Sequence, residues 1–148
     1  MSIYVEYRAI CLFLLGIFWA TGLSGCQKPL SDHRTPIDRV VDGDTVWAEG
    51  VKYRLIDLDA PEQHNNPSHG FKCEAERIHA EAATARAKEL LLDQPIRILT
   101  EGKPDRYGRT LAKLQLPDGR IFGDVLIAEG LAVRWTGEKH DWCAHLSQ

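Results

Sequence analysis

PIDRVVDGDTVWAEGVKYRLID, residues 36–57, is the stretch that decides the fold. It holds three runs rich in Val, Ile, Tyr and Trp, separated by turn residues that include two glycines; the runs are residues 36–41, 45–49 and 51–57. β-Branched and aromatic runs divided in this way are typical of short antiparallel strands joined by tight turns. The sequence therefore predicts that the domain begins with a β-meander.

One long helix is predicted after the meander. Residues 58–72 contain two prolines, two asparagines and a glycine, which is the composition of a loop. Residues 74–92, EAERIHAEAATARAKELLL, contain neither Gly nor Pro. Apolar residues recur in this run at the spacing of one helix face; they are Ala75, Ile78, Ala82, Ala85 and Leu92. This spacing predicts an amphipathic helix whose buried face carries these residues.

The remaining segments complete an α+β pattern that is mainly β. Residues 96–101 and 110–116 are predicted as strands, residues 124–129 as a short helix and residues 131–135 as an extended piece. The expected architecture therefore has one long helix and one or two short ones. A five-stranded, partly open barrel of the OB-fold type fits the number and the length of the strands.

The first residues have the layout of an export signal. Residues 9–23, AICLFLLGIFWATGL, are apolar, follow Arg8 and are shorter than the roughly 20 residues of a membrane-spanning helix. The next residues complete LSGC, which resembles the lipobox of bacterial lipoproteins and ends at Cys26. We therefore expect a lipoprotein-type signal peptide (1–25), a tether (26–35) and one domain (36–148). The expected protein is exported and anchored by lipid on the periplasmic or extracellular side; ordinary cleavage and a soluble secreted protein are the alternative.

Charge and cysteine content narrow the function. Lys and Arg number 18 against 21 Asp and Glu, the net charge is −3, and no basic run occurs. Because non-specific nucleic-acid binding depends largely on Lys and Arg at phosphates, a tight nucleic-acid binder is disfavoured, whereas an enzyme with transient contacts is not. With Cys11 in the signal and Cys26 in the lipobox, Cys73 and Cys143 remain as a possible disulfide. Two separate buried cysteines are the other reading.

Three polar clusters could carry chemistry: DGDT at 42–45, YRLIDLDAPE at 53–62 and DRYGRT at 105–110. Each alone resembles a turn or a strand end. Together they offer what phosphodiester hydrolysis requires, which is a cation site, a base for water and donors to phosphoryl oxygens. The candidates are Asp44 and Asp59 as hard oxygen ligands for calcium or magnesium, Glu62 as the base, and Arg54 and Arg109 as phosphate contacts.

At these positions the sequence resembles the thermonuclease, or staphylococcal nuclease-like, family. The matching motifs are VVDGDT at 40–45, YRLIDLDAPE at 53–62, DRYGRTLA at 105–112 and GLAV at 130–133. The resemblance implies an OB-fold barrel and calcium-dependent cleavage of DNA and RNA. It makes Asp44, Asp59 and the Ala60 backbone carbonyl metal ligands, and Arg54 and Arg109 phosphate and transition-state contacts. It further makes Glu62 the residue that activates or orients water, and Tyr107 a substrate contact.

Two departures and one addition accompany the resemblance. Ala60 stands where a threonine is frequent, and the aromatic pair that packs on the nucleotide is not evident. Trp135 replaces part of this pair, or it has a core or surface role. The stretches around Cys73 and Cys143 look like those of exported bacterial relatives, which favours the disulfide.

The net charge of the candidate site predicts how it binds a metal ion and a substrate. The five candidate side chains, three carboxylates and two arginines, sum to −1, so a divalent cation brings the site to +1 and should bind cooperatively with a phosphodiester. We expect the protein to be a monomer that takes nucleic acid as its substrate.

One alternative function is that of a non-catalytic OB-fold lipoprotein that binds nucleic acid, and another is that of a structural lipoprotein whose polar clusters are only turns. A zinc site from His64, His69, His79 and Cys73 is a further alternative, although their spacing fits no strong zinc pattern.

Overall fold

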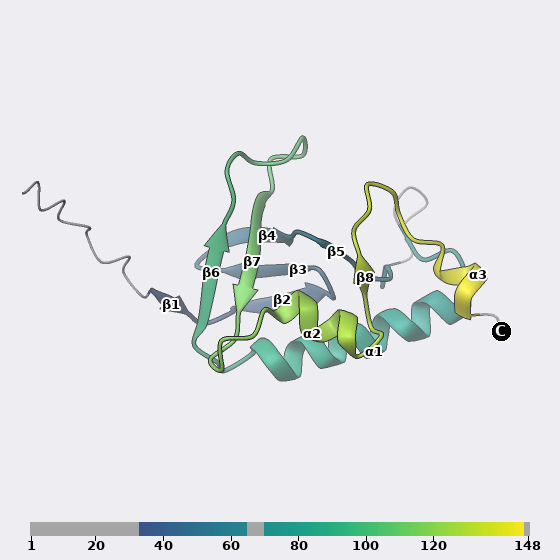
Figure 1. The fold of residues 1–148 in the computed structure, drawn as a ribbon, viewed down its shortest axis with the longest axis horizontal. Coiled ribbons are helices and arrows are strands. Elements are labelled where there is room, and N and C mark those ends of the chain that lie inside the picture. The colour runs from purple at the N-terminus through teal and green to yellow at the C-terminus, as the bar shows by residue number, and fades with distance from the viewer. Residues whose placement is uncertain (1–32, 65–69, 147–148) are drawn as a thin grey trace, which may run out of the picture. The chain divides into compact units, whose positions relative to one another are not determined.

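The computed structural model describes residues 33–64 and 70–146 (Figure 1). The predicted signal peptide, Cys26, most of the predicted tether and His69 lie outside these residues. Among the described residues, none of the helices combines the length and the apolarity that crossing a bilayer requires.

Six strands form one mixed sheet in the order β1-β6-β7-β4-β3-β2 (Figure 1). Their bounds are β1 Arg34–Thr35, β2 Arg39–Asp42, β3 Thr45–Ala48, β4 Val51–Leu55, β6 Ile96–Thr100 and β7 Thr110–Gln115. Neighbouring strands are antiparallel except β4 and β7, which are parallel. The meander predicted from residues 36–57 is therefore confirmed as β2, β3 and β4. The last two residues of the predicted tether form β1 and pair with β6, so the sheet begins before the predicted boundary.

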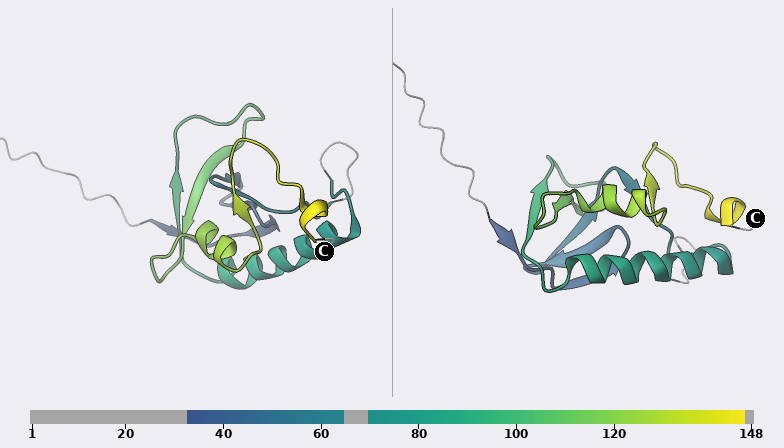
Figure 2. Two further views of the ribbon diagram at one scale, coloured as in Figure 1. Left: turned by 45° about the vertical axis from the view of Figure 1, so that its right-hand side comes forward. Right: turned by 60° about the horizontal axis from the view of Figure 1, so that its bottom comes forward.

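Two short strands and three helices complete the domain. Their bounds are β5 Leu58–Asp59, β8 Val133–Arg134, α1 Glu74–Leu91, α2 Phe122–Ala128 and α3 Trp142–Leu146. α1 packs along β2, α2 packs on β7, and α3 lies against α1 (Figures 1 and 2). The α+β, mainly β prediction and the OB-like fold are confirmed. The sheet has one strand more than the predicted five, and its outermost described strands, β1 and β2, do not pair, so the barrel is not closed.

A break at Asp57 divides the predicted strand 51–57. Asp57 has a φ of +66°, in the left-handed region that a continuing strand does not adopt. The chain therefore leaves the main sheet after Leu55, and β5 pairs with β8 in a separate two-stranded sheet. The Trp135 N–H donates to the Asp57 carbonyl at 3.1 Å and extends this pairing. Asp59 consequently faces the C-terminal part of the chain.

The predicted buried face of the long helix is wrong, although its bounds are right to one residue. Ile78 is 55% exposed, and Ala82 and Ala85 are exposed as well. The residues that α1 buries are Glu76, Ala80, Ala83, Thr84, Ala87 and Leu91. Small side chains on this face let the helix lie close to the sheet. Because alanines occur on every side of this helix, apolar spacing did not identify the buried side.

Gly43, in the turn between β2 and β3, lies at a close approach to the chain after β5. A Cβ added at Gly43 would lie 2.7 Å from the Ala60 Cβ and 3.4 Å from the Ala83 Cβ. The first distance is shorter than two carbons tolerate, so this position requires glycine. The turn is thereby pressed against Ala60, which follows Asp59.

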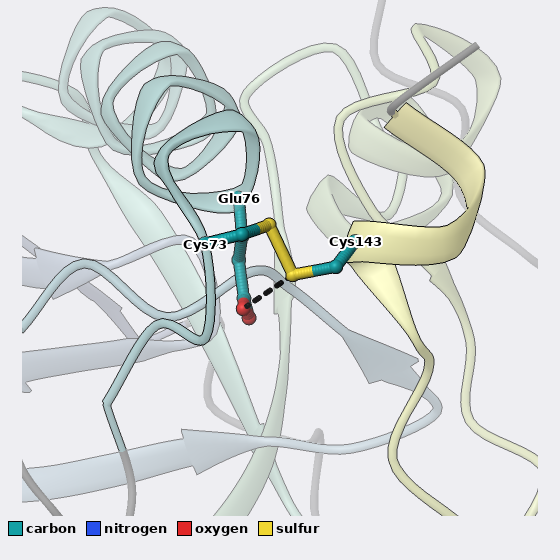
Figure 3. A group of neighbouring side chains, drawn as sticks. All are labelled: Cys73, Glu76 and Cys143. Carbon is teal, nitrogen blue, oxygen red and sulfur yellow. Dashed lines mark hydrogen bonds between the residues drawn. A yellow bond between two sulfur atoms is a disulfide. The ribbon is translucent and has the colours of Figure 1, made fainter.

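A disulfide joins two cysteines that lie near the two ends of the described range 70–146. Cys73, the N-cap residue of α1, is bonded to Cys143 in α3, with 6.0 Å between their Cα atoms (Figure 3). The predicted pairing is confirmed. The buried Glu76 carboxylate lies beside it, with Oε2 3.9 Å from the Cys143 sulfur. The bond fixes α3 to the first turn of α1.

Loss of this disulfide should lower thermal stability. The bond closes a loop with a sequence separation of 70 residues. The chain-entropy account of such a loop gives about 4 kcal/mol. Cys143→Ser should therefore melt roughly 10–20 °C lower than the oxidised protein in thermal unfolding followed by circular dichroism. The reduced parent protein should resemble the variant, and reductant should leave the variant unchanged. Equal melting temperatures for oxidised and reduced parent protein would contradict this.

Candidate active site

Asp44 is held inside the turn between β2 and β3. Its side chain is almost fully buried, and its Oδ1 accepts a hydrogen bond from the Thr45 hydroxyl at 3.0 Å. The Ala60 N–H donates to its Oδ2 at 3.4 Å, and its own N–H donates to Asp42 Oδ1 at 3.1 Å. The Asp-Gly-Asp sequence is thus a turn, as its pattern indicates, but its carboxylates face inward.

Arg54 compensates the charge of this turn. In the β3–β4 pairing it lies opposite Thr45, and it is flanked on the other side by β7. Its side chain is 15% exposed and makes an ion pair with Asp44. Its second terminal nitrogen lies 3.9 Å from Asp59 Oδ1. One half-buried guanidinium therefore lies beside both predicted metal ligands.

The two oxygens of Asp59 have different surroundings. Asp59 is 1% exposed, and its Oδ2 accepts the His140 N–H at 2.9 Å. Its Oδ1 is buried and has no hydrogen-bond partner, although the Lys139 ammonium lies 3.3 Å away. A buried carboxylate oxygen that lacks a donor is an available ligand for a cation. Asp44 and Asp59 are therefore a donor set that fits a hard divalent cation.

Glu62 lies beside the same lysine. The Lys139 ammonium contacts Glu62 Oε1 as well as Asp59. The backbone at Glu62 is fixed from the other side, because its N–H donates to Glu76 Oε1 at 3.4 Å. Glu76 also accepts the Lys72 N–H at 2.7 Å through Oε2. The first turn of α1 thus fixes the position of the segment that carries Glu62.

Arg109 is oriented by its own loop. Its Nε and its NH2 lie 2.7 Å from Asp105 Oδ2, and its N–H donates to Asp105 Oδ1 at 2.9 Å. Its guanidinium lies 5.4 Å from the centre of the Tyr107 ring, which is 60% exposed. A hydrogen bond of 2.9 Å from the Tyr107 N–H to Asp105 completes this turn. Asp105 therefore fixes both predicted substrate contacts of the β6–β7 loop.

Burial and neighbouring charges shift the pKa of two groups at the site, Arg54 and Asp42. Burial lowers the pKa of the Arg54 guanidinium; the Asp42 charge opposes this effect, and the positive charge of Arg109 adds to it. Burial also raises the pKa of the Asp42 carboxyl, against the charge of Arg54. Both guanidiniums are able to donate hydrogen bonds to phosphate oxygens.

The structure brings most of the predicted residues together. Arg54 lies between Asp44 and Asp59, and Lys139 joins Asp59 to Glu62, whereas the hydrogen bonds and the ion pair of Arg109 are with Asp105 in its own loop. Sequence reasoning missed four contributors to the site, which are Asp42, Glu76, Lys139 and the His140 N–H. Asp42 lay within the quoted DGDT motif. Nothing in the spacing of the other three indicated a role.

The site is a carboxylate cluster and not the cavity found in the domain. That cavity has a volume of about 60 Å³, and none of the five candidate side chains with predicted catalytic or metal roles lines it. Ion pairs of Lys113 with Asp57 and of Arg134 with Asp124 occur in its wall.

The zinc alternative receives no support from the described residues. His79 Nε2 contacts the Gly130 carbonyl oxygen at 2.9 Å, and Cys73 is in the disulfide. The group of potential ligands that does gather in the described part of the chain is Cys73, Glu76 and Cys143 (Figure 3), whose two sulfurs are bonded to each other.

Comparison with known proteins places this arrangement in a family. A micrococcal nuclease of Shigella flexneri is 31% identical over 128 residues, which cover 75% of this chain and 64% of that protein. An uncharacterized endonuclease of Escherichia coli O157:H7 is 28% identical over 107 residues, covering 70% of this chain and 60% of that protein. The chain thus spans slightly less than two thirds of the length of these relatives. Residues 52–146 match the staphylococcal nuclease homologue family, and the chain belongs to that family.

Proposed function

We propose that the chain is a calcium-dependent nuclease that hydrolyses phosphodiester bonds of DNA, RNA or both. The observation that carries this proposal is the buried pair Asp44 and Asp59 around Arg54, with one Asp59 oxygen lacking a hydrogen bond. The family membership and the names of the two relatives support it.

Calcium suits this donor set. Asp44 and Asp59 offer carboxylate oxygens, and the Ala60 carbonyl is the third protein ligand in the proposal. A site with so few protein ligands should bind calcium weakly, in the ~10⁻⁴–10⁻³ M range of extracellular modules. When bound, a divalent cation supplies Lewis-acid polarisation of the phosphate.

The side chains have separate roles in the proposed reaction. Glu62 accepts the proton of the attacking water, or orients that water, from a backbone that Glu76 fixes. Arg54 and Arg109 donate hydrogen bonds to the phosphoryl oxygens, where negative charge develops. Asp105 keeps the Arg109 guanidinium in one orientation, which lowers the entropy that its binding to phosphate costs. Tyr107 lies exposed beside this guanidinium and contacts the substrate.

A second candidate function is binding of nucleic acid without catalysis. Tyr107 is 60% exposed and Trp135 is 42% exposed, and exposed aromatic rings can stack on bases. The buried carboxylates speak against this function, because a passive phosphate-binding surface gains nothing from negative charge beside its arginines.

Digestion of DNA and of RNA with calcium, with a calcium chelator and with added zinc tests the enzyme. Calcium should support cleavage, the chelator should abolish it, and calcium added back should restore it. Zinc alone should not restore it. Binding of nucleic acid without cleavage in all conditions would leave the second candidate.

Two substitutions test the roles of individual side chains at saturating calcium. Glu62→Gln should slow cleavage by about 10²–10⁴-fold if Glu62 is the base. Arg109→Ala should slow it by roughly 10²-fold or more because it removes charge stabilisation. The matched controls are Glu89→Gln and Arg120→Ala, which remove charges from local ion pairs with Arg86 and Asp118. A folded Glu62 or Arg109 variant that cleaves as fast as its control would refute that role.

We also propose that the protein is an exported, monomeric lipoprotein anchored through Cys26. The sequence pattern at 23–26 supports export and lipidation, and the disulfide suits an oxidising compartment. Mass spectrometry of the N-terminal peptide should find a diacylglyceryl-modified Cys26 as the first residue, and Cys26→Ser should release the protein from the membrane fraction. An unmodified peptide that begins elsewhere would contradict lipidation.

A further inference from the structure

The chain supplies a cation of its own at the candidate metal site. The Lys139 ammonium lies 3.3 Å from Asp59 Oδ1 and contacts Glu62 Oε1. The lysine side chain is 48% exposed, whereas that of Asp59 is 1% exposed. Of the two groups, therefore, the ammonium is the one that can move into solvent.

The contact involves the Asp59 oxygen that is left for a ligand. Oδ2 already accepts the His140 N–H at 2.9 Å, whereas Oδ1 is buried and lacks a hydrogen bond. Calcium binds carboxylate oxygens at 2.3–2.6 Å. A calcium ion on Oδ1 and an ammonium 3.3 Å from the same atom would be close enough for strong repulsion between like charges. Calcium on Oδ1 therefore disfavours the observed position of the ammonium.

We propose that Lys139 is an internal competitor for the metal site. In the cation-free protein its ammonium pairs with Asp59 and Glu62, and it must leave Asp59 when a divalent cation binds there. This inference rests on the metal site of the proposed function. Its consequence is a lower metal affinity than the same carboxylates would have without the lysine, because binding must first break the lysine contacts.

The backbone that carries Lys139 is held while the side chain exchanges. The neighbouring His140 donates its N–H to Asp59, and its ring packs 4.7 Å from the Trp142 ring centre. Cys143 ties the same segment to α1 through the disulfide. The ammonium therefore returns to a fixed neighbourhood, and its local concentration beside Asp59 is high whenever the cation is absent.

The test is a calcium titration by isothermal titration calorimetry, with no nucleic acid present. Lys139→Met should bind calcium about tenfold more tightly than the parent, because both the ion pair and the repulsion are lost. Lys139→Arg keeps the positive charge and should bind no more tightly than the parent. Lys88→Met removes an exposed lysine in the last turn of α1 and should leave the affinity unchanged. Lys139→Gln serves as a second neutral variant, should the methionine variant fail to fold.

The outcomes separate this inference from the function on which it rests. Equal or weaker calcium affinity in the neutral Lys139 variants would overturn the competitor role, while saturable binding that Asp59→Asn abolishes would keep the metal site. Calcium binding that is absent from the parent and the neutral variants alike, or that Asp59→Asn leaves unchanged, would overturn the metal site and the inference together. Tighter binding confined to the neutral Lys139 variants would support both.

Discussion

Burial of two carboxylates around one arginine is the constraint on which the rest of the site depends. Asp44 and Asp59 have almost no exposed surface, and ionised groups in such places need a compensating charge in contact. Arg54 meets that need because β4 lies inside the sheet, between β3 and the parallel strand β7. A strand fixed on both sides gives its side chains little freedom, so the guanidinium stays where both carboxylates require it.

The second half of the site comes from a different part of the chain. Strands β2 to β5 supply the carboxylates and Arg54, while the segment after β8 supplies Lys139 and the His140 N–H. Pairing of β5 with β8 and the disulfide to α1 hold that segment in place. Glu76, buried in the first turn of α1, connects the two halves, since it contacts both the Glu62 backbone and the Cys143 sulfur.

Local sequence signals predicted the strands and pointed to the candidate side chains near their ends. This was possible because each motif combines part of a strand with the turn beside it. The DGDT turn and the end of β4 are separated by few residues, so their meeting follows from the hairpin alone. Contacts between residues far apart in the sequence could not be predicted from local motifs. Lys139 and Glu62, for example, are 77 positions apart. The two-residue strand β1 is too short for any periodicity. The face of α1 was misassigned because alanine, which dominates it, is tolerated both inside and outside.

The β5–β8 pairing has a consequence for biosynthesis. Asp59 emerges early from the ribosome, whereas the amide that satisfies its Oδ2 belongs to residue 140. A nascent chain therefore carries an incomplete carboxylate cluster until residue 140 has been made. The disulfide between Cys73 and Cys143, which ties the same C-terminal segment to α1, is disfavoured in a reducing cytosol. The order of synthesis and the redox state therefore both govern when the segment after β8 is fixed beside Asp59.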